Sequence, residues 1–252
     1  MKCNPFSANP LWRRIAASTL VLALCLPGGS PPHATEVVQA DPQPRLRVGP
    51  VDPYWLQKRW APADGLTAER AAEFEVEARL ARAHQGRIIR WSNLLALRLE
   101  NGLFVWLVDM GDASVAGFGC CEVYRLADVW PDLGFYVVFL SRDESAGYLL
   151  ISARTAAAVE TVWAPHRDPA TPGLLVSVLS DDMLGNAAEV WHLENGAWRR
   201  AYHCPRLTYG TEFRRWDAPG RAVLTVPDGK GGEREVPLAR EGGQWRTDTC
   251  EG

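Results

Sequence analysis

The densest group of oxygen-bearing side chains in the sequence is the segment Asp-Asp-Met-Leu-Gly-Asn at residues 181–186. Asp181, Asp182 and Asn186 offer the oxygen ligands that calcium prefers, but Ca²⁺ takes about six to eight of them. Asp and Asn also close tight turns, because their side chains hydrogen-bond to nearby backbone N–H groups. We therefore interpret the segment as a hairpin loop whose polar side chains can contribute to binding, and we predict no metal site.

Histidines are the second group of residues that could do chemistry. His192 and His203 lie on the two arms of a hairpin that is predicted to turn at Asn195-Gly196, so we hypothesise that they approach each other and contribute to binding. The alternative is a pair of ordinary surface or half-buried histidines. The sequence has no nucleophile elbow, phosphate loop, HExxH zinc helix or Cys-x-x-Cys pair. We therefore assign no catalytic residue and no cofactor.

Four cysteines follow the N-terminal leader: Cys120, Cys121, Cys204 and Cys250. An even number of thiols in an exported protein predicts disulfides. Bonding the two adjacent cysteines to each other would need a strained ring. Cys204 and Cys250 lie eight and seven residues after the glycine of a predicted hairpin turn, which favours a bond between them. The alternative partner of Cys250 is Cys120 or Cys121, if the last repeat returns to the first.

A series of β-hairpins must position these residues. The clearest hairpin is Val190–Cys204, where an Asn-Gly turn separates two arms with alternating apolar residues, the strongest local hairpin signal. Turn glycines recur at intervals of 45, 49 and 47 residues, at Gly102, Gly147, Gly196 and Gly243. This interval is typical of a four-stranded propeller blade. The spacing predicts a mainly β fold of about four propeller-like or open β-meander units, with a two-sheet sandwich as the alternative.

One helix is predicted ahead of the β units, over residues 66–85. Thr67 can cap its N-terminus, and Gly86 stands where a C-terminal glycine belongs. The apolar residues of the segment also alternate as they would in a strand. The abundance of Ala, Glu and Arg, which are better helix formers than strand formers, favours the helix.

The middle of the chain resembles a known group of proteins. The stretch Tyr124–Thr155, whose apolar run Phe135–Leu140 predicts a strand buried on both faces, is followed by Val-Trp-Ala-Pro at 162–165 and Val-Trp-His-Leu at 190–193. This combination is similar to a group of uncharacterised secreted bacterial proteins with propeller-like β repeats. The resemblance implies the fold and no site residue. The chain departs from the usual blade turn at 166–173, and Pro165, Pro169 and Pro172 predict a surface loop there.

The N-terminus has the pattern of a secretory signal peptide. Two arginines precede the apolar stretch Ile15–Leu26, which is shorter than the roughly 20 residues of a transmembrane helix. We predict cleavage after Ala34, with Ala40 as the alternative site. The predicted organisation is therefore a signal peptide at 1–34, a Pro-rich extended lead-in at 35–63 and a single all-β domain with its N-terminal helix at 64–252.

Charge and location limit the possible partners. Without residues 1–40 the chain keeps 24 basic and 29 acidic side chains, a net charge of −5, so a nucleic-acid partner is not expected. We expect an exported protein, periplasmic or secreted, without a membrane span after signal cleavage. The leading hypothesis is a non-enzymatic envelope protein that binds a protein or peptide through loops on one rim. The alternative is a hydrolase or lyase that acts on an envelope polymer, with carboxylates from different repeats.

Export of the protein can be tested directly. If the leader is a signal peptide, protein purified from its native host should begin at Thr35 or Asp41. N-terminal sequencing or intact mass measurement will show this. Retention of Met1 on a cytoplasmic protein would contradict the prediction.

Overall fold

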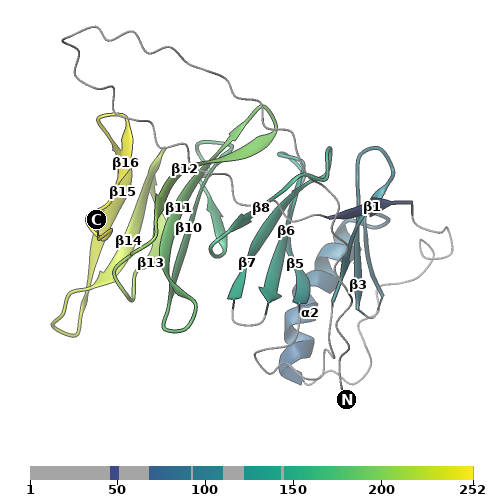
Figure 1. The fold of residues 1–252 in the computed structure, drawn as a ribbon, viewed down its shortest axis with the longest axis horizontal. Helices are drawn as coiled ribbons and strands as arrows, with labels where there is room; N and C mark the ends of the chain where they lie inside the picture. The colour runs from purple at the N-terminus through teal and green to yellow at the C-terminus, as the bar shows by residue number, and fades with distance from the viewer. Residues whose placement is uncertain (1–45, 51–67, 92, 110–121, 143–144, 252) are drawn as a thin grey trace, which may run out of the picture. The chain divides into compact units, whose positions relative to one another are not determined.

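The computed structural model describes residues 46–50, 68–91, 93–109, 122–142 and 145–251, and in these ranges the chain is mainly β (Figure 1). The strands form four antiparallel sheets of four strands each, which do not close into a ring. The predicted mainly β fold with repeated units and one helix is therefore confirmed. The predicted signal peptide, most of the predicted lead-in, Cys120 and Cys121 lie outside the described residues.

Sheets 1 and 2 come from the first part of the described chain. Sheet 1 has the order β1-β4-β3-β2, with β1 (Arg47–Gly49), β2 (Ile88–Trp91), β3 (Leu94–Arg98) and β4 (Phe104–Val108). Its strand β1 belongs to the predicted lead-in and pairs with β4, Val48 opposite Val105. Sheet 2 follows chain order, with β5 (Glu122–Trp130), β6 (Phe135–Arg142), β7 (Ser145–Ser152) and β8 (Ala158–Thr161).

Sheets 3 and 4 also keep the strands in chain order from one edge to the other. Sheet 3 consists of β9 (Pro165–Arg167), β10 (Leu174–Asp181), β11 (Gly185–Glu194) and β12 (Ala197–Cys204). Sheet 4 consists of β13 (Glu212–Ala218), β14 (Arg221–Pro227), β15 (Glu233–Glu241) and β16 (Gln244–Arg246). We call β2, β5, β9 and β13 the leading edges of the sheets, and β1, β8, β12 and β16 their trailing edges.

The helix α2 (Ala68–Ala83) occupies most of the segment predicted for it. Phe74, Glu77, Ala78 and Ala81 are buried, a spacing of three and four residues that places them on one face of a helix. The alternation that suggested a strand is therefore not the pattern of burial. The presence of a buried carboxylate on this face is explained by its partners, described below.

The four glycines that suggested the repeat lie in four different sheets, but not at equivalent positions. Counted from the leading edge of each sheet, Gly102 lies between the second and third strands (β3 and β4), whereas Gly196 and Gly243 lie between the third and fourth. These three have positive φ angles, as turn glycines do. Gly147 instead lies inside β7, where a Cβ would come within 2.7 Å of the carbonyl oxygen of Thr161. The prediction that all four mark equivalent turns is wrong, because Gly147 is needed for close strand approach.

Neighbouring sheets pack face to face through apolar side chains. Sheets 1 and 2 share one buried cluster with α2, sheets 2 and 3 share a second, and sheets 3 and 4 share a third. Strand β6 sends Tyr136, Val138 and Leu140 into the first cluster and Phe135 and Val137 into the second. The prediction that this strand is buried on both faces is therefore confirmed.

The leading edges of sheets 2, 3 and 4 also contact one another. Arg167 of β9 donates to the carboxylate of Asp132, which follows β5, with an Nη2–Oδ2 distance of 2.5 Å. His166 of β9 stacks on Phe213 of β13, with 4.1 Å between the ring centroids. The short strand β9 corrects the prediction of a surface loop starting at Pro165: its pairing with β10 overrides the local proline signal.

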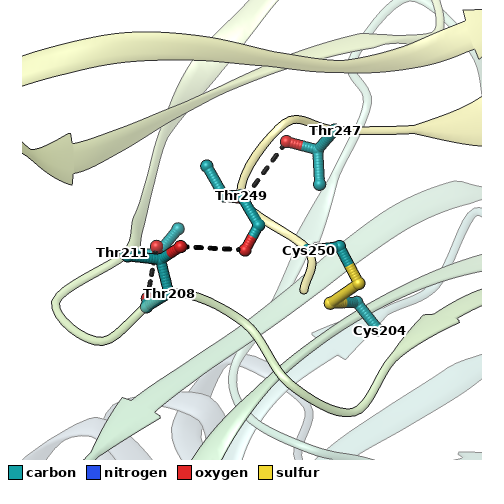
Figure 2. The surroundings of a disulfide bond; sticks show 6 residues. All are labelled: Cys204, Thr208, Thr211, Thr247, Thr249 and Cys250. Atoms are coloured by element: carbon teal, nitrogen blue, oxygen red, sulfur yellow. Dashed lines mark hydrogen bonds between the residues drawn. A yellow bond between two sulfur atoms is a disulfide. The ribbon is translucent and has the colours of Figure 1, made fainter. Parts of the chain in front are cut away.

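One disulfide joins the last strand of sheet 3 to the segment that follows sheet 4. Cys204 ends β12 and is bonded to Cys250, with a Cα–Cα distance of 5.8 Å (Figure 2). This pairing confirms the prediction from strand-end spacing and excludes the alternative with Cys120 or Cys121. The bond closes a loop across 46 residues of sequence, a constraint worth about 4 kcal/mol in the entropic model of disulfide stabilisation.

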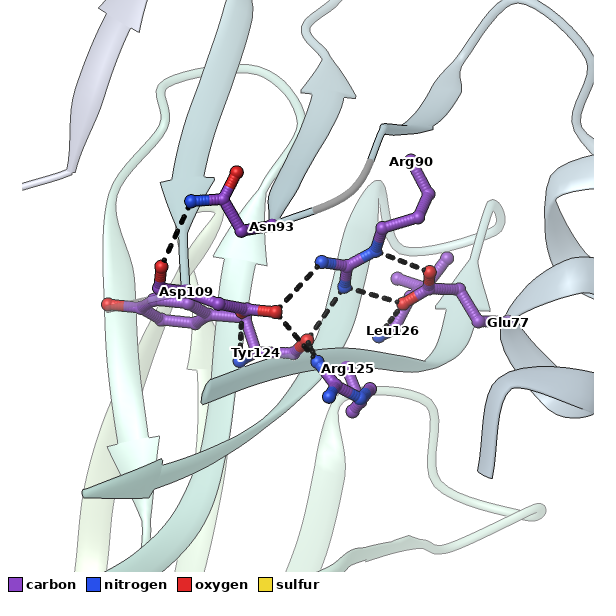
Figure 3. Close-up of polar contacts among 7 residues, drawn as sticks. All are labelled: Glu77, Arg90, Asn93, Asp109, Tyr124, Arg125 and Leu126. Atoms are coloured by element: carbon purple, nitrogen blue, oxygen red, sulfur yellow. Dashed lines mark hydrogen bonds and ion pairs between the residues drawn. The ribbon is translucent and has the colours of Figure 1, made fainter. Parts of the chain in front are cut away.

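A buried charge cluster fixes α2 to sheets 1 and 2 (Figure 3). Glu77 accepts hydrogen bonds from Arg90 Nε and Nη2 of β2, at 2.7 and 2.9 Å, and from the backbone N–H of Leu126 in β5, at 2.9 Å. Asp109 accepts from Arg90, from Arg125 and from the backbone N–H of Tyr124. The side chains of Glu77 and Arg90 are 0% exposed. Two carboxylates and two guanidinium groups thus balance inside the protein.

Neutralising Glu77 should test this anchor. We expect Glu77→Gln to lower the free energy of unfolding by about 3 to 5 kcal/mol, because it leaves the buried charge of Arg90 without its main partner. Glu75→Gln is the matched control, since Glu75 lies on the same helix and is exposed, and it should change stability by less than about 0.5 kcal/mol. Urea denaturation measures both. Equal stability of the two variants would contradict the role of the cluster.

Candidate functional site

Three of the five predicted binding residues lie together at one end of sheets 3 and 4. The turn between β10 and β11 is held by Asp181, whose Oδ1 accepts backbone hydrogen bonds from Met183 and Leu184, each at 2.8 Å. The hydrogen bond from Leu184 has the largest effect on the pKa of Asp181, followed by that from Met183, and both lower it below its usual value. Asn186 Oδ1 accepts a hydrogen bond from Ser180 Oγ at 2.9 Å. Asp181 and Asn186 thus hold the turn through hydrogen bonds, as the interpretation of this segment as a hairpin loop expects.

A second loop lies against this turn. The loop between β12 and β13, residues 205–211, donates from the backbone of Gly210 to Ser180 Oγ at 2.6 Å and from Leu207 to the Asn186 carbonyl at 3.2 Å. A hydrogen bond between Tyr209 and Asp182 raises the pKa of the tyrosine. We call residues 181–186 together with 205–211 the two-loop surface.

The two-loop surface exposes two large side chains to solvent. Met183 is 70% exposed and Tyr209 is 56% exposed, the two highest values for large apolar residues in the described part of the chain. The exposed fractions of the others are 45% or lower. Exposure of a methionine and a tyrosine on contacting loops is the combination that binding surfaces use, because both side chains offer large contact areas.

The C-terminal segment supports the second loop from its other side. The backbone of Thr208 donates to the carbonyl of Thr249 at 2.8 Å, and Glu251 donates to the carbonyl of Arg206 at 2.9 Å. Thr211 Oγ1 closes the loop on the Thr208 carbonyl at 2.6 Å (Figure 2). No local sequence pattern marks this loop, because the C-terminal segment that supports it lies about 40 residues away along the chain.

The two predicted histidines do not approach each other. His203 faces Glu189 on β11, with 3.6 Å between its Nδ1 and the carboxylate. Trp191 donates to the same carboxylate, so it shares this face, and the next residue, His192, points to the other face. There its ring lies 6.0 Å from that of Trp245. Regular alternation from the His192–Arg199 pair would place His203 on the same face as His192. The register shift between Val190 and Trp191 moves His203 to the opposite face, opposite Glu189. The hypothesis of a joint histidine site is therefore wrong.

Glu189 is the centre of a second polar cluster. Its buried carboxylate accepts hydrogen bonds from Arg200 Nη1 at 2.9 Å, from Trp191 Nε1 at 3.0 Å and from the backbone N–H of Val162 at 3.1 Å. Burial raises its pKa, but the donors outweigh burial and the pKa of Glu189 is lowered. The carboxylate therefore stays ionised and occupied, which suits a structural link between sheets 2 and 3 better than acid–base catalysis.

The described residues contain no group of three or more His, Cys, Asp or Glu side chains that could hold a metal ion. In the same part of the chain, α2 does not have the length and apolar composition that a bilayer-spanning helix needs. Asp168, the remaining buried carboxylate among these residues, accepts backbone hydrogen bonds from Ala170 and from Gly220. The buried acids thus bind main-chain or arginine donors.

The acid stability of the protein should depend on Glu189 and Asp168. The donors that surround each carboxylate outweigh burial and lower both pKa values. Each therefore stabilises the fold above the unfolded pKa of about 4, and this contribution is lost as pH falls through the lower folded pKa. We expect a melting temperature that is nearly constant between about pH 7 and 5 and that falls below about pH 4.

Glu189→Gln should lower stability at neutral pH by about 3 kcal/mol, because Arg200 loses a buried partner, and should flatten the acid limb of the profile. Glu194→Gln, at an exposed position near the end of the same strand, is the control. Thermal denaturation at a series of pH values measures both effects. An acid limb that is equally steep in Glu189→Gln and wild-type protein would contradict the assignment.

The chain matches no protein-family profile, no curated protein and no solved structure. We therefore argue function from the arrangement of its residues alone.

Proposed function

We propose that the protein is an exported, non-enzymatic binding module that captures a protein or peptide partner through the two-loop surface. The observation that carries the proposal is the joint exposure of Met183 and Tyr209 on two loops that hydrogen-bond to each other. Tyrosine is enriched among the residues that dominate binding energy. Methionine adapts its shape to different apolar partners.

The rigidity of the surface supports this role. Asp181 fixes one loop through two backbone hydrogen bonds, and the other loop is held between that turn and the C-terminal segment next to the disulfide. Because the loop is already ordered, binding of a partner to Tyr209 costs little loop entropy. Pre-organisation of this kind increases affinity without any additional contact.

The trailing edges of the sheets are poor alternatives for partner binding. Trailing edges β1, β8 and β16 are only three or four residues long, and β12 carries a register shift opposite Val190 and Trp191. Short and bulged edges resist the addition of a further strand. The outer face of sheet 4 is charged, with Arg215 paired to Glu235. Loops are therefore the better binding elements in the described part of the chain.

The enzymatic alternative has less support. It requires carboxylates from different repeats to converge where a substrate can reach them. Glu77 and Asp109 do converge, but both are buried and bonded to Arg90.

The presence of a disulfide is compatible with export to an oxidising compartment, where an envelope protein or peptide would be the partner.

Peptide selection tests the proposed function. Purified protein is used to select binders from a random displayed-peptide library, and the dissociation constant of a selected peptide is measured by calorimetry. We expect Tyr209→Ala to weaken binding at least about tenfold, in the range of a binding hot spot. Tyr209→Phe keeps the ring and should lose less.

The matched control is Leu103→Ala, which truncates an exposed apolar side chain of sheet 1, far in the chain from both loops. It should bind the selected peptide as wild-type protein does. Failure to select any peptide, or selected peptides that bind Tyr209→Ala as tightly as wild type, would contradict the proposal.

A further inference from the structure

The segment that follows β16 has a particular attachment to the rest of the protein. After Arg246 the chain runs beside the β12–β13 loop, where Cys250 forms an isolated β-bridge with Leu207. Thr208 and Thr249 are joined twice, because both the backbone N–H and the Oγ1 of Thr208 donate to the Thr249 carbonyl, at 2.8 and 3.1 Å. The segment is therefore held by these hydrogen bonds, by burial of Thr249, which is 1% exposed, and by one covalent bond to Cys204 at the end of β12.

The disulfide is the strongest of these attachments. Cys204 is 0% exposed at the end of β12, in the apolar cluster shared by sheets 3 and 4, whereas Cys250 is half-buried. A single hydrogen bond contributes about 1 kcal/mol to net stability, less than the constraint that a disulfide supplies. The covalent bond is thus the largest single restraint on the C-terminal segment, beside the burial of Thr249 and the packing of Cys250 on the apolar cluster.

The other side of the loop has no covalent support. There Gly210 donates to Ser180 Oγ and Leu207 donates to the Asn186 carbonyl. These two bonds flank Tyr209, and they tie the loop to Ser180 and Asn186, a residue pair at the turn end of β10 and β11. The order of the Tyr209 loop therefore depends on support from both sides, one of which ends in a disulfide.

We propose that the Cys204–Cys250 disulfide is a redox switch that sets the order of the two-loop surface. A dithiol reductant attacks the more accessible Cys250 Sγ with one thiolate, forming a mixed disulfide while Cys204 leaves as a thiolate and takes up a proton. The second thiol of the reductant then displaces Cys250. Two electrons pass to the protein, which ends with two thiols, and the reductant ends as its own disulfide.

Reduction has a local structural consequence. The C-terminal segment detaches, the Thr208 N–H and the Arg206 carbonyl turn to water, and the loop that carries Tyr209 becomes mobile. Sheets 1 and 2 keep their structure, because the buried cluster around Arg90 and the apolar contacts between these sheets do not involve the disulfide. The effect of loop mobility on partner binding rests on the proposed function. The loosening of the loop on reduction does not.

Hydrogen exchange tests the switch on the full chain. In protein reduced with dithiothreitol, the amides of Thr208 and Glu251 should exchange at least tenfold faster than in oxidised protein. The amides of β5, β6 and β7 should be unchanged. Unchanged exchange at Thr208 and Glu251 would overturn the proposal, and so would faster exchange throughout β5–β7, because that result means global unfolding.

The double variant Cys204→Ser/Cys250→Ser is the control for the reductant. It should show the fast exchange of the reduced protein with or without dithiothreitol. If its loop amides are as protected as those of oxidised wild type, the disulfide does not order the loop and the proposal fails. If the variant does not fold, the comparison of oxidised and reduced wild-type protein decides the question alone.

Binding provides a second, separable measurement. A peptide that binds the oxidised protein through Tyr209 should bind the reduced protein at least tenfold more weakly. Equal affinity in both states would overturn the switch as a control of binding. Failure of every peptide to bind the oxidised protein would contradict the proposed function instead, and the exchange experiment would still decide whether reduction loosens the loop.

Discussion

Buried carboxylates that accept backbone N–H groups across sheet boundaries are the interaction on which this fold depends. Glu77 and Asp109 bind the N–H groups of Leu126 and Tyr124 in sheet 2. Glu189 of sheet 3 binds Val162, which follows the last strand of sheet 2, and Asp168 beside sheet 3 binds Gly220 in a turn of sheet 4. An ionised group is costly to bury unless donors surround it. Each carboxylate therefore fixes the position of one sheet against the next, while apolar side chains supply most of the packing energy.

This use of the acidic residues has a consequence for function. A carboxylate that is buried, ionised and bonded to main-chain N–H groups or to arginine is unavailable as a general acid, a nucleophile or a metal ligand. The buried acids of the described chain are committed in this way, so the chemistry expected of a hydrolase does not converge at them. The surface offers what the interior does not: side chains free to meet a partner, at Met183 and Tyr209, on loops already held in position.

In the function and the switch that we propose, the support of these loops links partner binding to the redox state of the Cys204–Cys250 pair. Sheet 3 supplies the turn at residues 181–186 and leads into the loop at 205–211. The segment after sheet 4 supports that loop, and the Cys204–Cys250 disulfide connects this segment to sheet 3. The buried anchor at Arg90 and the half-buried disulfide thus serve different ends of the molecule. The anchor holds α2 to sheets 1 and 2, whereas in the switch that we propose the disulfide opens without disturbing that anchor.

The sequence by itself determined the features that depend on neighbouring residues. The Asn-Gly turn at Gly196 and the apolar run of β6 follow from turn chemistry and side-chain alternation, and the cysteine pair followed from corresponding strand ends. Tertiary structure decided what depends on distant residues. Gly147 is a site of close strand approach, and β9 forms despite its proline because β10 pairs with it. His192 and His203 lie on opposite faces because the pairing of β11 with β12 shifts its register between them. Glu77 finds its donors in β2 and β5, and no local pattern records such a pairing, because a charge becomes an anchor only when folding brings its partners together.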